Sequence, residues 1–207
     1  MTQPNDGAFR IIETMRGGAD GLVHLDRHLA RLRRSCAAFD IQLNAPLLDD
    51  LLASIPPNGL RRVRFTVDLN GHIDMICPEV APITGPWTVA LSPTRLNSAD
   101  PWLQIKTTNR ALYDTARASL PATIDEWIFE NEHGALCEGT ITNIFVQKDG
   151  QLLTPPRTNG LLPGILRETL LAQGAAQEAQ LRPDDLLQAE AFFVGNSLRG
   201  LIPAVLR

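Results

Sequence analysis

The sequence around Lys106 suggests that this lysine could take part in chemistry. It stands in the run Leu-Gln-Ile-Lys-Thr-Thr-Asn-Arg, where Arg110 is the nearest basic neighbour and Trp102 and Ile105 are apolar neighbours. A lysine that apolar surroundings desolvate has a lowered pKa, so its amine can act as a nucleophile or a general base. An ordinary surface lysine ahead of a helix is the alternative that this run leaves open.

A second group of polar and turn-forming residues lies between positions 138 and 167. Glu138 begins the run Glu-Gly-Thr-Ile-Thr-Asn-Ile-Phe, the run Leu-Leu-Thr ends at Thr154, and the run Leu-Pro-Gly-Ile-Leu-Arg ends at Arg167. In the last run, Pro163 is expected at the first position of a helix, whose first N–H groups have no partner within the helix. Such a terminus can hold a phosphate through those N–H groups and the helix dipole.

Together these segments resemble the signature of the class IV (fold type IV) pyridoxal-phosphate-dependent aminotransferases. That signature has a glutamate, a small residue, an asparagine, an aliphatic and an aromatic residue. A strand ending in threonine follows, and then a turn of the form aliphatic-x-Gly-aliphatic-x-basic. Every position and gap is met here, and the resemblance extends from about Phe9 to Pro203. It implies a two-lobed α+β fold, similar to D-amino-acid aminotransferase, with pyridoxal 5'-phosphate in the cleft between the lobes.

The resemblance assigns roles in cofactor binding to individual residues. It implies that Lys106 forms the Schiff base and that Glu138 pairs with the protonated ring nitrogen, which keeps the ring an electron sink. It makes Arg31, in the run His-Leu-Ala-Arg-Leu, a bidentate clamp on the phosphate. The other arginines nearby are expected to form a solvated basic face: Arg27, Arg33 and Arg34.

Further cofactor contacts implied by the resemblance lie in the phosphate cup and beside it. Leu162 matches the family's apolar residue against one face of the ring. Leu166 stands where the family commonly has a hydroxyl residue, so only backbone contacts are expected there. A last segment, Val-Gly-Asn-Ser-Leu-Arg-Gly, brings polar groups to a turn. The implied cofactor-binding set therefore also contains Asn143, Gly164, Ile165, Asn196 and Ser197.

Three features resemble the aminodeoxychorismate lyase branch of the family. They are the Asn-Ser-Leu run at 196–198, the Asn-Arg pair that follows Lys106, and Thr14, where branched-chain enzymes typically have glycine. The implied reaction eliminates pyruvate from 4-amino-4-deoxychorismate to give 4-aminobenzoate, a step of folate biosynthesis. Lys106 and Thr14 would be its catalytic residues, although an ordinary strand threonine remains an alternative for Thr14.

Other functions of the same fold stay open at this point. A branched-chain or D-amino-acid aminotransferase would use the same lysine, and a cofactor-binding protein without turnover belongs to another class. The ligands of the substrate carboxylates are open as well, with Arg110 and Arg199 as candidates.

These residues need secondary structure to position them, and the sequence predicts two lobes. A small α+β lobe is expected over residues 1–80, a linker over 81–86, and a larger lobe carrying Lys106 over 87–207, because residues 78–86 are rich in proline. Alternation and helical spacing predict the elements. The predicted strands are 9–15, 61–68, 73–76, 87–91, 126–130, 141–147, 152–154 and 190–194, and the predicted helices are 25–39, 46–54, 108–118 and 163–172.

Composition narrows the class of protein. The 207 residues carry a formal net charge of -4, which argues against nucleic-acid binding, and no apolar run is long enough to span a membrane. The N-terminus lacks the features of a signal peptide, and the three cysteines are far apart, which predicts free thiols and no metal site. A cytoplasmic enzyme with a small-molecule substrate is expected. The resemblance also implies a homodimer. It leaves open whether the protein works alone or associates with aminodeoxychorismate synthase.

Overall fold

The computed structural model describes residues 9–207, which form two compact units. The first unit holds the described residues up to Pro82 together with Ile105–Asn109, and the second holds Ile83–Gln104 and Arg110–Arg207. The chain therefore changes unit inside the segment expected as the linker. The larger lobe was expected to carry Lys106, but residues 105–109 group with the first unit because they pair with one of its strands.

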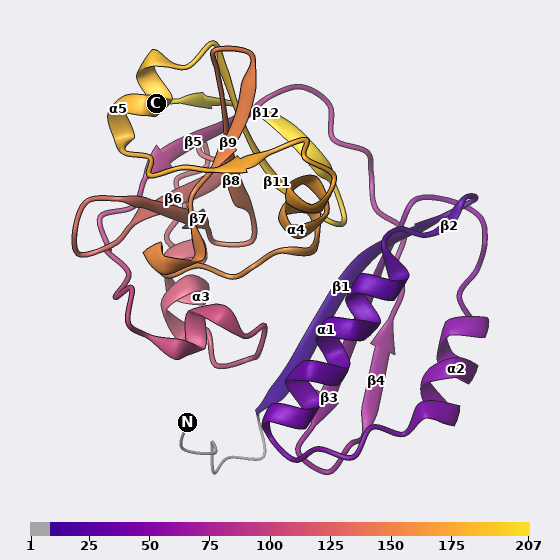
Figure 1. The fold of residues 1–207 in the computed structure, drawn as a ribbon. Helices are drawn as coiled ribbons and strands as arrows, with labels where there is room; N and C mark the ends of the chain where they lie inside the picture. Colours follow the sequence, from indigo (N-terminus) through magenta and orange to yellow (C-terminus); the bar gives the residue numbers. More distant parts are fainter. Residues whose placement is uncertain (1–8) are drawn as a thin grey trace. The chain divides into compact units, whose positions relative to one another are not determined.

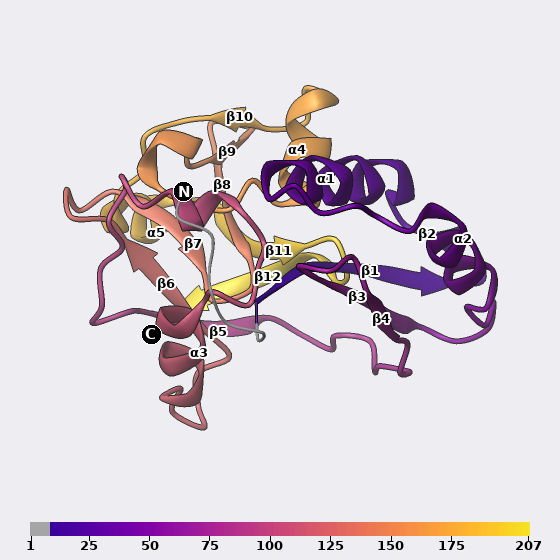
Figure 2. The same cartoon turned by 90° about the horizontal axis from the view of Figure 1, so that it is seen from below.

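The first unit is an antiparallel four-stranded sheet with strand order β2-β1-β3-β4 (Figure 1). Alternation along β3 decides its faces, because Val63, Phe65 and Val67 are fully buried while the polar residues between them are not. Figure 2 shows helices α1 and α2 on the same side of these strands. The elements are β1 (Arg10–Gly18), β2 (Gly21–Leu22), α1 (Leu25–Ala38), α2 (Ala45–Ala53), β3 (Arg61–Asp68) and β4 (Ile73–Ile76).

Helix α1 supplies several buried polar side chains of the first unit. Its buried residues recur at helical spacing, which turns one stripe of the helix toward the sheet: His28, Arg31, Leu32, Ser35 and Cys36. The predicted solvated basic face is confirmed, because the arginines on the other side of the helix are exposed: Arg27, Arg33 and Arg34. The stripe therefore brings charged groups into the interior beside β1.

The second unit is built around a β-barrel. Strands β8, β11, β12, β5, β6 and β7 are neighbours in that order, and the pairing of β7 with β8 closes the ring, while β9 and β10 extend the sheet beyond β8. The strands are β5 (Trp87–Leu91), β6 (Glu126–Glu130), β7 (Leu136–Gly139), β8 (Asn143–Lys148), β9 (Gln151–Thr154), β10 (Gln177–Glu178), β11 (Ala191–Asn196) and β12 (Gly200–Leu206). The helices are α3 (Ala111–Ala118), α4 (Ile165–Ala172) and α5 (Pro183–Gln188), with short 3-10 turns at Pro101–Gln104 and Arg157–Asn159. Within residues 9–207, no helix is long and apolar enough to cross a membrane.

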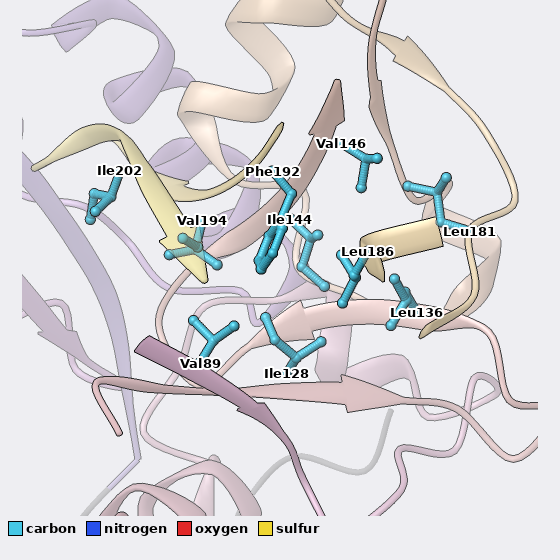
Figure 3. Packing of buried hydrophobic residues seen from close by; sticks show 11 residues of the cluster. Val89, Ile128, Leu136, Ile144, Val146, Leu181, Leu186, Phe192, Val194 and Ile202 are labelled. Atoms are coloured by element: carbon cyan, nitrogen blue, oxygen red, sulfur yellow. The ribbon is translucent and has the colours of Figure 1, made fainter. Parts of the chain in front are cut away.

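Apolar side chains fill the barrel (Figure 3). Ile128 of β6, Ile144 of β8 and Val194 of β11 are fully buried there, and Leu186 of α5 packs against them. Residues that alternate with these point to the opposite face of the sheet, where Phe129 belongs to a second buried cluster. Because the interior is a packed core, groups that act on a ligand have to lie at the ends of the strands or outside the ring.

The predicted elements that differ from the structure do so for local reasons. Strands β3, β4, β5 and β6 cover their predicted ranges in full. Helix α3 begins at Ala111 and not at Thr108, because the backbone N–H of Thr108 donates to the carbonyl oxygen of Arg10 at 2.9 Å. Strands β7 and β12 were not predicted, since β7 ends in Glu-Gly, which is typical of a turn, and β12 contains Pro203.

Candidate functional site

Glu138 and Asn143 are paired where β7 meets β8. Oε1 of Glu138 accepts the backbone N–H of Leu162 at 3.1 Å, and Nδ2 of Asn143 donates to the carbonyl oxygen of Leu162 at 2.9 Å. Both side chains belong to residues that are buried. The backbone of Leu162 is thereby held on two sides, and the structure brings these three predicted site residues together.

The start of helix α4 differs from the predicted start. The helix begins at Ile165 with Gly164 as its N-cap, so Pro163 is not its first residue. A Cβ on Gly164 would lie 2.1 Å from Oδ1 of Asn143, and therefore glycine is required at this close approach. The N–H groups of Ile165 and Leu166 belong to the first turn, where the helix itself offers no acceptor, and they are suited to hold an anion.

Asn196 shapes the turn between β11 and β12. Its Oδ1 accepts the N–H groups of Leu198 at 3.1 Å and Arg199 at 3.0 Å, and its Nδ2 donates to the carbonyl oxygen of Ile141 at 3.2 Å. The resemblance predicted contacts of Asn196 with phosphate or substrate, whereas the structure uses both ends of this amide to brace the turn. Ser197 is buried in the same turn.

Loops of the second unit meet near the start of α4. A Cβ on Gly195 would lie 2.9 Å from Cδ2 of Leu166, so the end of β11 lies directly against the first turn of that helix. Asn196 in turn reaches Ile141 in the loop between β7 and β8. The structure therefore gathers the predicted phosphate cup and the Asn-Ser turn in one region of the second unit.

The two arginines considered as substrate ligands have contacts within the second unit. Nη2 of Arg110 donates to the carbonyl oxygen of Thr140 at 3.0 Å, and its Nε donates to Asp114 at 2.8 Å. The guanidinium carbon of Arg199 lies 5.8 Å from the ring centre of Trp87. Arg110 therefore braces the loop that follows Glu138.

Glu126, which the sequence analysis did not single out, organises that same loop. Its buried carboxylate accepts the N–H groups of Thr140 at 3.0 Å and Ile141 at 3.1 Å, and the hydroxyl groups of Thr140 and Thr142. Burial raises the pKa of Glu126, and these hydrogen bonds and the charge of Arg117 oppose the rise. The sequence feature that could have indicated Glu126 is a carboxylate at the start of an apolar strand, Glu-Trp-Ile-Phe-Glu.

In the first unit, Glu13 lies at the centre of a buried charged cluster. Its Oε1 accepts Nε–H of Arg31 at 2.7 Å, its Oε2 accepts Nη2–H of Arg31 at 2.8 Å, and Oε2 also lies 2.6 Å from Nδ1 of His28. The resemblance implied that the bidentate edge of Arg31 clamps the cofactor phosphate, but in the structure Nε and Nη2 of Arg31 are bound to Glu13.

We expect the Glu13 cluster to make the stability of the first unit depend on pH. Burial acts to raise the pKa of Glu13, but the charge and hydrogen bonds of Arg31 and His28 outweigh it and lower the pKa from 4.5 to about 2. Because the folded state has the lower pKa, this stabilisation is complete above pH 4.5 and is lost as the pH falls toward 2. Glu13→Gln should lower the free energy of unfolding at neutral pH by about 3 kcal/mol, because it removes the buried negative charge.

Urea denaturation of the wild type and the variant, at about pH 7 and again at about pH 3, measures this difference, which should shrink at the lower pH. Glu79→Gln is the matched control, because Glu79 pairs with Arg61 at 3.3 Å but its side chain is 67% exposed. The control should change the free energy of unfolding by less than about 1 kcal/mol. Equal effects of the two substitutions would contradict a special role of Glu13.

Lys106 and Thr14 are brought to one face of the sheet in the first unit. The carbonyl oxygen of Lys106 accepts the N–H of Ile12 at 2.8 Å, and the next residue along forms a β-bridge with β1. Side chains alternate along both segments, so Lys106, opposite Ile12, shares a face with Thr14. The cluster around Glu13 lies on the other face, beside α1.

Comparison with known proteins connects this arrangement to one enzyme family. The sequence profile of the family described as amino-transferase class IV matches residues 10–206. A solved structure from Mesorhizobium loti, provisionally named an amino-acid aminotransferase, is 42% identical, with a TM-score of 0.89 over 96% of this chain and 100% of that chain. A Schizosaccharomyces pombe protein, provisionally named an aminodeoxychorismate lyase, is 27% identical over 88% of this chain and 83% of its own length. The branched-chain amino acid aminotransferase of Escherichia coli shares the fold, with a TM-score of 0.79 at 18% identity over 96% of this chain and 77% of that chain.

Proposed function

Because the chain belongs to the class IV aminotransferase family of pyridoxal-phosphate-dependent enzymes, we propose that it is a lyase acting on 4-amino-4-deoxychorismate. In this reaction the substrate loses a proton from C4, the C3–O bond of its enolpyruvyl ether breaks, and the enolpyruvate that leaves takes up a proton to become pyruvate, so that the products are 4-aminobenzoate and pyruvate. A second keto-acid substrate is not needed, because the loss of both groups makes the ring aromatic. The observation that carries the proposal is the position of Thr14 on the same face of the sheet as Lys106.

The residues of the second unit fit the cofactor. Glu138 is a buried carboxylate, which suits a protonated pyridine nitrogen, and the first turn of α4 suits a phosphate. Gly164 leaves no room for a side chain beside Asn143, so the backbone at the helix start can approach a ligand closely. When bound, pyridoxal phosphate withdraws electrons from the carbon next to the substrate amine, which eases the loss of a proton from that carbon.

We propose a separate role for each of the residues that the resemblance assigned. Nζ of Lys106 would hold the cofactor and would act as the base that takes up the proton lost from C4 of the substrate. Glu138 keeps a negative charge beside the ring nitrogen, and Leu162 packs against the ring. Asn143 keeps the backbone of Leu162 in place through the bond of 2.9 Å. Arg31 would add positive charge for the phosphate.

Removing the hydroxyl of Thr14 should slow pyruvate release. Thr14→Val keeps the shape of the side chain in β1, opposite Arg64, and is expected to lower the rate about 10- to 100-fold if the hydroxyl bonds near the leaving group. Thr14→Ser, which keeps the hydroxyl, should retain most of the rate. A coupled assay for pyruvate measures both variants, and an unchanged rate in Thr14→Val would refute the catalytic role of Thr14.

The transaminase alternative has one observation in its favour. The Mesorhizobium loti protein, which is 42% identical, carries the name of an amino-acid aminotransferase. A transaminase would use Lys106 and Glu138 in the same way, but it would need a 2-oxo acid as its second substrate. The two reactions therefore differ in their substrates and not in these residues.

One experiment separates the two reactions. The protein is incubated with 4-amino-4-deoxychorismate and no keto acid, and pyruvate and 4-aminobenzoate are followed together. In parallel it is given branched-chain and D-amino acids with 2-oxoglutarate. Equal amounts of the two products support the lyase. Amino transfer without pyruvate release would establish the transaminase and would leave the family assignment unchanged.

A further inference from the structure

Tyr113 is a side chain of α3 that reaches Glu138 in the candidate site. Its hydroxyl lies 2.5 Å from Oε1 of Glu138, so it donates a short hydrogen bond to that carboxylate. Its ring packs edge-on against Phe129, with 5.4 Å between the ring centres, and is partly buried against the cluster that contains Phe129. The hydroxyl is therefore positioned by packing that is independent of the hydrogen bond itself.

The proton of this pair stays on Tyr113. Burial and the neighbouring charge of Glu138 both raise the pKa of the Tyr113 hydroxyl far above its ordinary value. Two other groups act on it: Cys137 raises its pKa, and Arg110, whose guanidinium carbon lies 5.5 Å from the Tyr113 ring centre, lowers it. Tyr113 is therefore a hydrogen-bond donor throughout the pH range in which an enzyme works.

Two donors share one oxygen of the Glu138 carboxylate. Oε1 accepts the Tyr113 hydroxyl and, at 3.1 Å, the backbone N–H of Leu162. Because the two donors come from different segments of the chain, they restrain the rotation of the carboxylate group. Hydrogen bonds to the charged form of a carboxylate also favour that form, so both donors hold Glu138 as an anion.

We propose that Tyr113 is a positioning residue that holds the Glu138 carboxylate charged and in a fixed orientation for the ring nitrogen of bound pyridoxal phosphate. This inference rests on the proposed role of Glu138 as the partner of that nitrogen. As a consequence, the proton shared between Glu138 and the ring nitrogen stays on the ring nitrogen. Without the Tyr113 hydroxyl, Glu138 becomes a stronger base and competes for that proton.

The first test uses the protein without cofactor, so it does not depend on catalysis. The Glu138 carboxyl carbon, labelled with carbon-13 and assigned by its loss in Glu138→Gln, is titrated by NMR. Tyr113→Phe keeps the ring against Phe129 and should raise the pKa of Glu138 by about one unit. Ser98→Ala is the matched control, because its hydroxyl donates to Glu132 at 2.6 Å in an exposed pair of the same unit. An unchanged Glu138 pKa in Tyr113→Phe would overturn the inference.

The second test follows the ring nitrogen of nitrogen-15-labelled pyridoxal phosphate in the loaded protein. Tyr113→Phe should move its chemical shift toward that of the unprotonated ring, in the same direction as Glu138→Gln but by less. A shift in Glu138→Gln and none in Tyr113→Phe would overturn the role of Tyr113 and leave that of Glu138 intact. No shift in Glu138→Gln would overturn the proposed role of Glu138 and, with it, this inference.

Discussion

Lys106→Ala is expected to abolish covalent attachment of the cofactor and to lower turnover by at least about 1,000-fold, because it removes the amine that we propose both holds the cofactor and acts as the general base. The fold should survive, since this segment is held to β1 by backbone hydrogen bonds that the substitution does not remove, from the N–H of Ile12 to the oxygen of Lys106 and from the N–H of Thr108 to the oxygen of Arg10. The absorbance band of the bound cofactor, which should be lost in the variant, tests the attachment. The circular dichroism spectrum, which should be unchanged, tests the fold.

The chain offers a matched control, because it contains only two lysines, Lys106 and Lys148. Lys148 ends β8, and its Nζ lies 3.5 Å from Oδ1 of Asp185. Lys148→Ala should keep the absorbance band and the turnover. Borohydride reduction of the wild type and peptide mapping should find the cofactor on Lys106. A label on Lys148 would contradict the assignment.

Glu138→Gln should keep the cofactor bound and slow turnover roughly 100- to 1,000-fold. Glutamine has the shape of glutamate, and its oxygen can still accept the N–H of Leu162, so the loop into α4 should stay in place. It has no negative charge, and therefore it cannot keep the ring nitrogen protonated as we propose that Glu138 does. Cofactor titration measures the binding, and single-turnover kinetics measure the chemical step.

The control for this substitution is Glu130→Gln. Glu130 ends β6 in the same unit and lies 3.6 Å from Arg95, on no segment of the proposed site. Its substitution should leave the single-turnover rate within about twofold of the wild type. A near-normal rate in Glu138→Gln would refute the role of Glu138 as the partner of the ring nitrogen.

Much of the fold could be predicted because it depends on local patterns. The alternation in Arg-Arg-Val-Arg-Phe-Thr-Val-Asp defines β3, and the structure buries every second residue of it. The α+β class and the family assignment are confirmed by the match over residues 10–206. The weakly patterned pieces were missed, among them β12, in which Pro203 lies opposite Phe193 in the ladder.

The candidate site was predicted in part. Glu138, Asn143 and Gly164 belong to one motif, and the structure brings them together around Leu162. Asn196 was placed in the right turn, but its amide bonds to the backbone. Its spacing in the sequence carries no information about which acceptor the side chain reaches.

Local sequence patterns are enough to predict which residues can do chemistry here and which short segments carry them, because turns, strand alternation and helix starts depend on near neighbours. The partners of the long polar side chains become known from the folded structure. Glu13 binds Arg31 from 18 residues away, and Tyr113 reaches Glu138 from 25 residues away. The segment around Lys106 pairs with β1, although the two segments lie at opposite ends of the sequence of the first unit. Such pairs depend on how distant elements pack, and packing sets the distances at which a hydrogen bond or an ion pair can form.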